Sequence, residues 1–256
     1  MNNNIRQSTD QNTTQLLVSV QNPDEAKIVC GQEVDILDVK APQNGPLGRV
    51  DSDCLAEILQ WPYLPPMVSC ALGELVDCCP DSTNEFLHST DPNRRLNYVK
   101  IGLAHQHDNP NWQNTWLKLR ARLPGLSELV PVAYADHENC GAPDVNQVLD
   151  FALASNCRVL LIGTFEKNGS NLFDHCSIPH LKSIRSATFN AGIKLCLAGS
   201  IKLVNLESTL SIGADFVGVR GAVCHKYVRD GHICKNSLQK FRQSLASSQK
   251  LGKENF

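Results

Sequence analysis

The segment LLVSVQNPDEAKIVCGQEVDILDVK, residues 16–40, contains one complete strand–helix–strand unit. Leu16–Val20 and Ile36–Lys40 are short apolar runs of the kind that form buried parallel strands, and the residues between them leave room for one helix. Asn22 followed by Pro23 is typical of a helix N-cap and first helical residue. The segment therefore predicts a parallel βαβ unit.

The same pattern continues along the chain. Apolar runs rich in Val, Ile and Leu begin near Leu16, Ile36, Met67, Tyr98, Leu129, Val159, Lys194 and Phe216. Later helices are predicted over Pro143–Ser155, Ile178–Gly192, Leu203–Gly213 and Asn236–Leu245. Eight strands that alternate with helices predict a single (β/α)8 TIM barrel over residues 16–246. A disordered N-terminal tail (residues 1–15) and a flexible C-terminal tail (residues 247–256) are expected, because both are poor in apolar residues.

An open doubly wound sheet is the alternative fold. Such a sheet would normally carry a GxGxxG dinucleotide loop after its first strand, whereas Gln21, Asn22 and Pro23 follow here. The pattern favours the barrel and disfavours an enzyme that uses nicotinamide or flavin.

Composition excludes several classes of partner. The 256 residues include 24 Lys and Arg against 26 Asp and Glu, and a net charge of −2 offers no basic field for nucleic acid. The longest apolar runs, such as Val159–Ile162, are far shorter than the roughly 18 residues of a membrane helix. The odd count of eleven cysteines, in a long chain that opens without a signal-peptide pattern, predicts reduced thiols and a cytoplasmic location.

Polar residues follow most of the predicted strands, and the carboxyl ends of strands form the mouth of a barrel. They are Ser19, Asp38, Lys40, Ser69, Lys100, Tyr134, Asp136, Lys167, Ser200 and Arg220. Asp38 and Lys40 are two residues apart on one strand, so both share the face of Ile36. We expect both charges to point towards the barrel axis or its mouth.

Lys40 and Lys100 together indicate a positive cavity. Burying Lys40 and Asp38 costs several kcal/mol unless they pair, which favours a functional role over the alternative of a structural ion pair. The alternative for Lys100 is a side chain that reaches the rim. A lysine desolvated beside another cation has a lowered pKa, so its neutral amine can form a Schiff base. The pair predicts aldolase-like chemistry, although phosphate sites can also contain two lysines.

The last two strands are followed by loops that suit a phosphate. Gly199 and Ser200 follow the seventh, and Arg220 and Gly221 follow the eighth, where backbone N–H groups and a guanidinium can hold an oxyanion. Tight turns without a ligand are the alternative. We predict that a phosphorylated small-molecule substrate contacts Ser19, Asp136, Gly199, Ser200, Arg220 and Gly221.

No metal or organic cofactor is predicted. Neighbouring ligand types such as His137 with Cys140, or Cys224 with His225, lack CxxC…CxxC or HExxH spacing. A GxSxG nucleophile motif is also absent from the sequence, so serine hydrolysis has no support.

Several ordered strings resemble the (5-formylfuran-3-yl)methyl phosphate synthase family over residues 16–245. They are Leu16–Ser19, Asp35–Pro42, Gly45–Gly48, Tyr98–Leu103, Tyr134–Asp136, Leu172–Asp174, Leu197–Ile201 and Asp215–Ala222. The resemblance implies a barrel lyase that condenses two glyceraldehyde 3-phosphate molecules into the furan phosphate precursor of methanofuran, a one-carbon carrier. It also implies roles for three residues: Lys40 as the Schiff-base lysine, Asp38 as its proton-handling neighbour and Lys100 as the general base.

One position departs from the family pattern. The family has an Asp four residues before a lysine that is kept here as Lys167, which we also predict to be catalytic. This chain has Gly163 in place of that Asp. Loss of that acid should leave the pocket more positive and impair one proton transfer. Glu166 could substitute only if its loop turned it inwards. The segment Leu75–Arg95 and the surplus of cysteines match no function that we can state.

Two other functions stay open. A catalytically altered paralogue could bind a phosphorylated metabolite as a partner subunit, or a Schiff-base aldolase could act on another phosphosugar, because fold does not fix function. The sequence does not determine the number of copies in an assembly, so a homo-oligomer is also left open.

Overall fold

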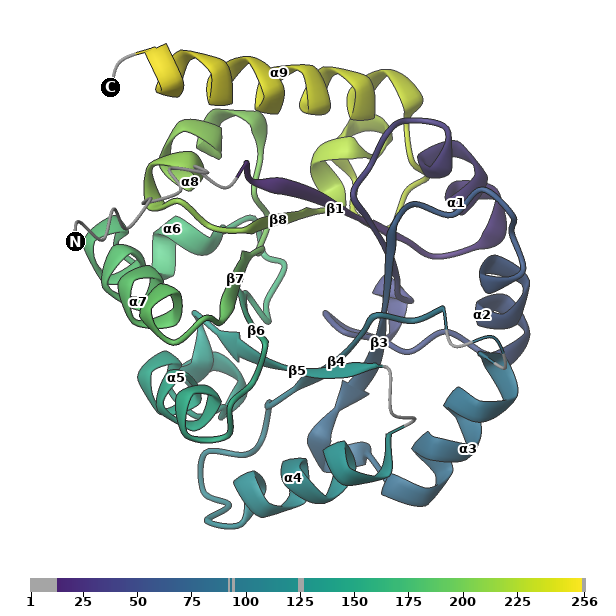
Figure 1. Ribbon diagram of the computed structural model, residues 1–256, viewed down its shortest axis with the longest axis vertical. Helices are drawn as coiled ribbons and strands as arrows, with labels where there is room; N and C mark the ends of the chain where they lie inside the picture. Colours follow the sequence, from purple (N-terminus) through teal and green to yellow (C-terminus); the bar gives the residue numbers. More distant parts are fainter. Residues whose placement is uncertain (1–12, 92, 94, 124–126, 255–256) are drawn as a thin grey trace, which may run out of the picture.

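The computed structural model describes residues 13–91, 93, 95–123 and 127–254. Its strands are parallel, each pairs with the next along the chain, and β8 pairs with β1 to close the barrel (Figure 1). The strands are β1 (Gln15–Val20), β2 (Ile36–Val39), β3 (Met67–Glu74), β4 (Tyr98–Gly102), β5 (Glu128–Tyr134), β6 (Val159–Gly163), β7 (Lys194–Leu197) and β8 (Phe216–Val219). The predicted (β/α)8 TIM barrel is confirmed.

Helices surround the barrel (Figure 1). They are α1 (Pro23–Cys30), α2 (Ser52–Leu59), α3 (Pro80–Thr90), α4 (Trp112–Arg122), α5 (Val145–Ala154), α6 (Leu172–His175), α7 (Ile178–Asn190), α8 (Leu206–Ile212) and α9 (Lys235–Glu254). Side-chain caps fix several starts: Asn22 accepts a hydrogen bond from the Glu25 N–H at 2.9 Å, and Asp144 begins a capping box at α5. Within the described part of the chain, no helix has the length and apolar character needed to cross a membrane.

The last helix is longer than the sequence predicts. We expected it to end at Leu245 and a flexible tail to begin at residue 247, whereas α9 continues to Glu254, so residues 247–254 are helical. Over residues 235–250 of this helix, the buried side chains are those of Leu238, Phe241 and Leu245.

The N-terminal boundary also shifts. Residues 1–12 of the predicted disordered tail lie outside the described residues. Gln15 already belongs to β1, and the Thr14 hydroxyl is buried and donates to the Ala214 carbonyl at 2.8 Å. The Gln249 amide of α9 donates to the Thr14 carbonyl at 2.7 Å. The start of β1 and the end of α9 are therefore tied together.

Alternate residues of each strand face either the barrel axis or the helices. Inside the barrel, Leu17, Ile36 and Phe216 belong to one apolar cluster, whereas Leu37 and Val39 pack in the outer layer against helices. Because side chains alternate along a strand, the residues that follow the interior apolar positions by two also face inwards. The interior of the barrel is therefore filled by apolar side chains towards the amino ends of the strands and by polar side chains near their carboxyl ends.

Candidate active site

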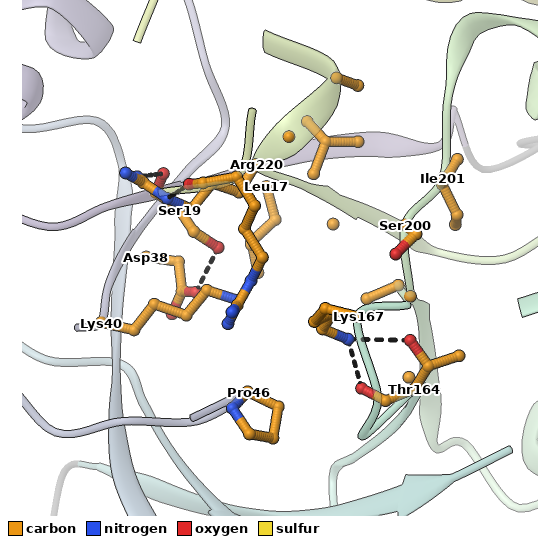
Figure 2. Close-up of a pocket in the computed structure, with 18 of the residues that line it drawn as sticks. Leu17, Ser19, Asp38, Lys40, Pro46, Thr164, Lys167, Ser200, Ile201 and Arg220 are labelled. Carbon is orange, nitrogen blue, oxygen red and sulfur yellow. Dashed lines mark hydrogen bonds between the residues drawn. The ribbon is translucent and has the colours of Figure 1, made fainter. Parts of the chain in front are cut away.

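A cavity of about 270 Å³ lies at the carboxyl ends of the strands. All four predicted catalytic residues line it: Asp38, Lys40, Lys100 and Lys167. Figure 2 shows Asp38 and Lys40 on one side and Lys167 on the facing side. The basic side chains in the wall are Lys40, Lys100, Lys167, Lys202, Arg220 and Arg229, and within the described residues Asp38 is the one carboxylate among them. The cavity is therefore strongly positive and suited to an anionic ligand.

Asp38 is held by three donors from neighbouring strands. Register pairs it with Ser19 on β1 and Ser69 on β3, whose hydroxyls donate to Oδ2 at 2.8 Å and Oδ1 at 2.7 Å. The Lys100 amine lies 2.5 Å from Oδ1. Burial alone would raise the pKa of Asp38, but the charges of Lys100 and Lys40 and these hydrogen bonds outweigh it and lower the pKa. Asp38 is thus a fixed carboxylate.

Lys40 shares the inward face with Asp38, as the alternation along β2 predicts, and is half-buried. Within the described residues, no carboxylate lies within 4.0 Å of its amine, because Asp38 pairs with Lys100. Burial and the charge of Lys100 hold the pKa of Lys40 well below its ordinary value, Asp38 opposes the shift, and Arg229 and Lys167 add to it. Lys40 can therefore present a neutral amine to an electrophile.

Lys167 lies at the facing wall, after β6. Its amine donates to the Thr164 carbonyl at 2.5 Å and to the Thr164 hydroxyl at 2.8 Å (Figure 2). Burial and the charge of Arg229 lower the pKa of Lys167 to about 8, and Asp136 opposes the shift. Lys167 can therefore both donate and accept a proton near neutral pH.

Gly163 leaves an open place in the wall beside Lys167. A Cβ on Gly163 would meet only the Leu161 side chain, at an ordinary contact distance of 3.5 Å. Glu166 does not fill this place, because its carboxylate accepts hydrogen bonds from Asn139 at 3.2 Å and Asn168 at 2.8 Å. The loop therefore turns Glu166 away from the cavity.

The loops after β7 and β8 line the cavity with Gly199, Ser200, Gly221 and Ala222. Gly199 and Ser200 have positive φ angles of 98° and 53°, and a side chain on Gly199 would press against Thr164 at 3.0 Å. In the described structure, no hydrogen bond uses the N–H groups of Gly199, Ser200, Gly221 or Ala222. These groups can donate to an anion such as phosphate.

Arg220 has a different role from the one we predicted. All five N–H groups of its guanidinium donate within the protein: to the carbonyls of Ser19, Arg229 and Gly231 and to both carboxylate oxygens of Glu25. None is left for a phosphate. The guanidinium instead holds the loop that follows β8 against β1 and α1, because burial requires every donor to be satisfied.

Asp136 does not line the cavity, although we predicted that it contacts the substrate. Its carboxylate accepts the N–H groups of Phe165 and Glu166 at 2.7 and 2.8 Å. It therefore positions the loop that carries Lys167. Ser19, Gly199, Ser200 and Gly221 do line the cavity.

Sequence reasoning missed two residues near the cavity. Arg229 lines the wall and donates to the carbonyls of Pro42 and Gly45, both at 3.0 Å, but it follows the last strand by too many residues to appear as a strand-end residue. Glu74 ends β3, which is eight residues long, whereas we took Ser69 as the polar end of that strand. The pair Gly73-Glu74, directly after an apolar run, was the available signal.

The described residues contain no cluster of side chains that could bind a metal ion. Within the described residues, no group of three or more His, Cys, Asp and Glu side chains is close enough together to hold a metal ion. All eleven cysteines are free thiols, as the sequence predicts. Burial raises the pKa of Cys196, inside the barrel, to about 12, so this thiol is protonated near neutral pH.

Comparison with known proteins supports a single family. A family model described as 4-HFC-P synthase matches residues 16–242. A protein of Methanococcus maripaludis (strain C5) named (5-formylfuran-3-yl)methyl phosphate synthase is 32% identical over 228 residues, which are 88% of this chain and 96% of the relative. A protein of the same name from Methanopyrus kandleri is 29% identical over 238 residues, covering 90% of this chain and 98% of the relative.

Solved structures share the fold at low sequence identity. Phosphoribosyl anthranilate isomerase from Thermotoga maritima has a TM-score of 0.64 and 12% identity, covering 91% of this chain and 99% of that one. 3-Hexulose-6-phosphate synthase from Salmonella typhimurium has a TM-score of 0.64 and 15% identity, covering 92% and 100%. At such identities the likeness establishes the barrel alone.

Proposed function

The chain belongs to the 4-HFC-P synthase family and is an enzyme, and we propose that it condenses two glyceraldehyde 3-phosphate molecules into (5-formylfuran-3-yl)methyl phosphate. The observation that carries the proposal is the half-buried Lys40 amine. It lies in a positive cavity beside the Asp38–Lys100 ion pair, and its pKa is well below the ordinary value for lysine. A neutral amine there is the nucleophile that an imine mechanism needs.

The first step joins Lys40 to the substrate. The neutral amine attacks the carbonyl carbon of one triose phosphate and forms a carbinolamine, which loses water to give the imine. The Lys100 ammonium donates the proton that the leaving hydroxyl needs, and it is then neutral. Asp38, 2.5 Å away, stabilises the charged form of Lys100 before and after this transfer.

The second step makes the carbon–carbon bond. The neutral Lys100 amine removes a proton from the carbon next to the imine, which gives an enamine and restores the Lys100 ammonium. The enamine carbon attacks the aldehyde carbon of a second triose phosphate. Ring closure, with loss of phosphate and water, then forms the aromatic furan, and addition of water to the Lys40 imine frees the amine and releases the aldehyde product.

The substrate phosphates have two places to bind. The N–H groups of Gly199 and Ser200 after β7, and of Gly221 and Ala222 after β8, are available as donors at the cavity wall. Lys202 and the other lining cations add positive charge. Ser19 contributes indirectly, since its hydroxyl is committed to Asp38.

Borohydride trapping tests the covalent step. Reduction in the presence of glyceraldehyde 3-phosphate should attach the substrate to Lys40, as peptide mass spectrometry would show. Lys40→Arg should abolish both the adduct and the furan product, because arginine stays protonated. Lys118→Arg, on the exposed side of α4, is the matched control and should retain both. An adduct on a different lysine, or a furan product formed by Lys40→Arg, would contradict the proposal.

The same assay separates the alternatives. Ultraviolet absorbance of a conjugated furan aldehyde, with its mass, identifies the product. Binding of triose phosphate without an adduct or a product would instead favour a phosphate-binding protein.

A further inference from the structure

A hydrogen-bonded pair of acidic side chains, Tyr134 and Glu74, runs from the cavity wall into the layer behind it, apart from Asp38. The Tyr134 hydroxyl, at the end of β5, donates to Glu74 Oε1 at 2.6 Å. The Ala104 N–H donates to Glu74 Oε2 at 3.0 Å. Tyr134 lines the cavity, whereas Glu74 is half-buried at the end of β3 and does not line it. The pair therefore links the cavity to a side chain that meets solvent.

The backbone of β3 and β4 allows the Glu74 side chain of β3 to reach the Tyr134 side chain of β5. β4 lies between β3 and β5 and ends at Gly102, where a Cβ would collide with the Glu74 carboxylate and the Tyr134 hydroxyl. The β3–β4 register shifts between Ala71 and Glu74, and Gly73 has a φ of 93°. Such an irregularity re-aims the side chain that follows it. Three local features thus direct Glu74 across β4 towards Tyr134.

Among the described residues, the cavity wall contains no carboxylate besides Asp38. Asp38, its one carboxylate within the described residues, already accepts from Ser19, Ser69 and Lys100. A reaction in which substrate hydroxyl groups add and leave needs an acceptor for their protons.

We propose that Tyr134 and Glu74 form a proton route that takes a proton from a substrate hydroxyl in the cavity and passes it towards solvent. This inference rests on the proposed function, because ring closure requires a hydroxyl oxygen to attack a carbonyl carbon. In this proposal Tyr134, which lines the cavity, is the residue that contacts the substrate hydroxyl, and Glu74 acts through it.

The proton transfers accompany ring closure. The substrate O–H bond breaks as the oxygen forms its bond to the carbonyl carbon, and the released proton binds Tyr134 Oη. The proton that Tyr134 held moves to Glu74 Oε1, so the tyrosine stays neutral and Glu74 becomes the neutral acid. The carbonyl oxygen receives a proton from the Lys167 ammonium. Exchange with solvent then returns Glu74 to its carboxylate form and Lys167 to its ammonium form.

The surroundings of the pair fit this direction of transfer. Burial raises the pKa of Glu74, and the hydrogen bonds from Tyr134 and Ala104 partly oppose the shift. His105, after β4, also opposes it, while Asp77 in the turn after β3 adds to it. Burial and the charge of Glu74 raise the pKa of Tyr134 well above its ordinary value, and Cys140 and Asp136 add to this shift. Glu74 is thus a better proton acceptor than an ordinary carboxylate, and Tyr134 does not ionise.

Two substitutions test the route in the full-length enzyme. Tyr134→Phe and Glu74→Gln should each lower kcat for furan formation by about 10²-fold and leave KM almost unchanged. Both should still give the borohydride adduct on Lys40, because imine formation does not use the pair. The pH–rate profile of Glu74→Gln should keep the acidic limb that protonation of Lys40 sets, and it should lose the additional fall in rate that protonation of Glu74 causes in the wild type.

The matched controls lie at the other end of the barrel. Tyr98→Phe removes a hydroxyl that contacts the Met67 sulfur at 3.7 Å, and Glu128→Gln alters a carboxylate at the start of β5. Both should retain the wild-type kcat and pH profile.

The outcomes separate this inference from the proposed function. A wild-type enzyme that forms the furan, with unchanged kcat and pH profile in both variants, would overturn the proton route alone. Loss of the adduct in folded Tyr134→Phe and Glu74→Gln, checked by circular dichroism, would overturn it in favour of a structural role. A wild-type protein that gives neither adduct nor furan would contradict the proposed function and remove the basis of the route.

Discussion

The low pKa of Lys40 depends on the ion pair that the neighbouring Asp38 carboxylate forms with Lys100 rather than with Lys40. Asp38 pairs with Lys100 at 2.5 Å, so Lys40 faces the positive cavity without a close carboxylate of its own among the described residues. The alternation along β2 predicted that Lys40 and Asp38 share a face. It did not predict this partner, because pairing across strands depends on register, and Asp38, Ser69 and Lys100 come from three different strands.

At the scale of single residues, Arg229→Gln should raise the pKa of Lys40. The positive charge of Arg229 lowers the pKa values of both Lys40 and Lys167, so its removal favours their protonated forms. The pH at which borohydride trapping on Lys40 is half-maximal should therefore shift upwards. Arg229→Lys, which keeps the charge but loses the paired bonds to Pro42 and Gly45, should shift it less. An equal shift in both variants would assign the effect to loop position instead.

Lys167 should react with amine reagents faster than ordinary surface lysines. Its pKa of about 8 leaves a larger fraction of neutral amine at neutral pH than a lysine with the ordinary pKa of 10.5 has. Limited acetylation followed by peptide mass spectrometry should show Lys167 modified before the exposed Lys118. Equal labelling of the two would contradict the lowered pKa.

At the scale of elements, one buried ion pair ties the closing strand to the first helix. The Arg220 guanidinium after β8 contacts the Glu25 carboxylate of α1 at 2.8 and 3.3 Å, and both side chains are buried. Glu25 also accepts the Gln21 N–H at 2.9 Å and the Ile233 N–H at 3.3 Å. The pair therefore joins three segments that are distant in sequence.

Glu25→Gln should destabilise the protein strongly. It leaves the buried Arg220 charge without its partner, which typically costs about 3 kcal/mol or more of unfolding free energy. Urea denaturation would measure the loss. The control is Asp24→Asn, whose side chain is 91% exposed and pairs with Lys27 at the surface, and its effect should stay below about 1 kcal/mol. Similar losses in both variants would contradict the structural role of the pair.

The order of elements was predictable from the sequence, and the contacts of single polar groups were not. Apolar runs and helix caps gave the barrel because they depend on local spacing. Arg220 was predicted to bind phosphate since its position after β8 suits that role, but its partner Glu25 lies 195 residues away in sequence. Glu74 was missed because the irregularity at Gly73 lengthens β3 beyond its apolar run.

At the scale of the whole molecule, the active site lowers the stability of the fold. The pKa of Lys40 is lowered in the folded state relative to its ordinary value of 10.5. Between these two pKa values the unfolded chain binds more protons, so the unfolding free energy rises with pH. Below the folded pKa, the full cost of a buried charge is present.

Lys40→Met should therefore stabilise the protein while it abolishes the reaction. The expected gain is on the order of 1 kcal/mol at neutral pH and should shrink as pH rises towards the ordinary lysine pKa. Urea denaturation at neutral and at alkaline pH would measure it, with Lys118→Met as the surface control. A gain that grows with pH would show that desolvation of Lys40 is not the cause.

The hydrogen bond between Gln249 and Thr14 makes the barrel a candidate for circular permutation. A short linker could join residue 254 to residue 13, because α9 already contacts the start of β1. New termini could open at Tyr63, an exposed position in the loop before β3, and therefore on the face opposite the cavity. Such a rearranged gene should encode a protein that keeps every strand neighbour, and with it the geometry of Lys40.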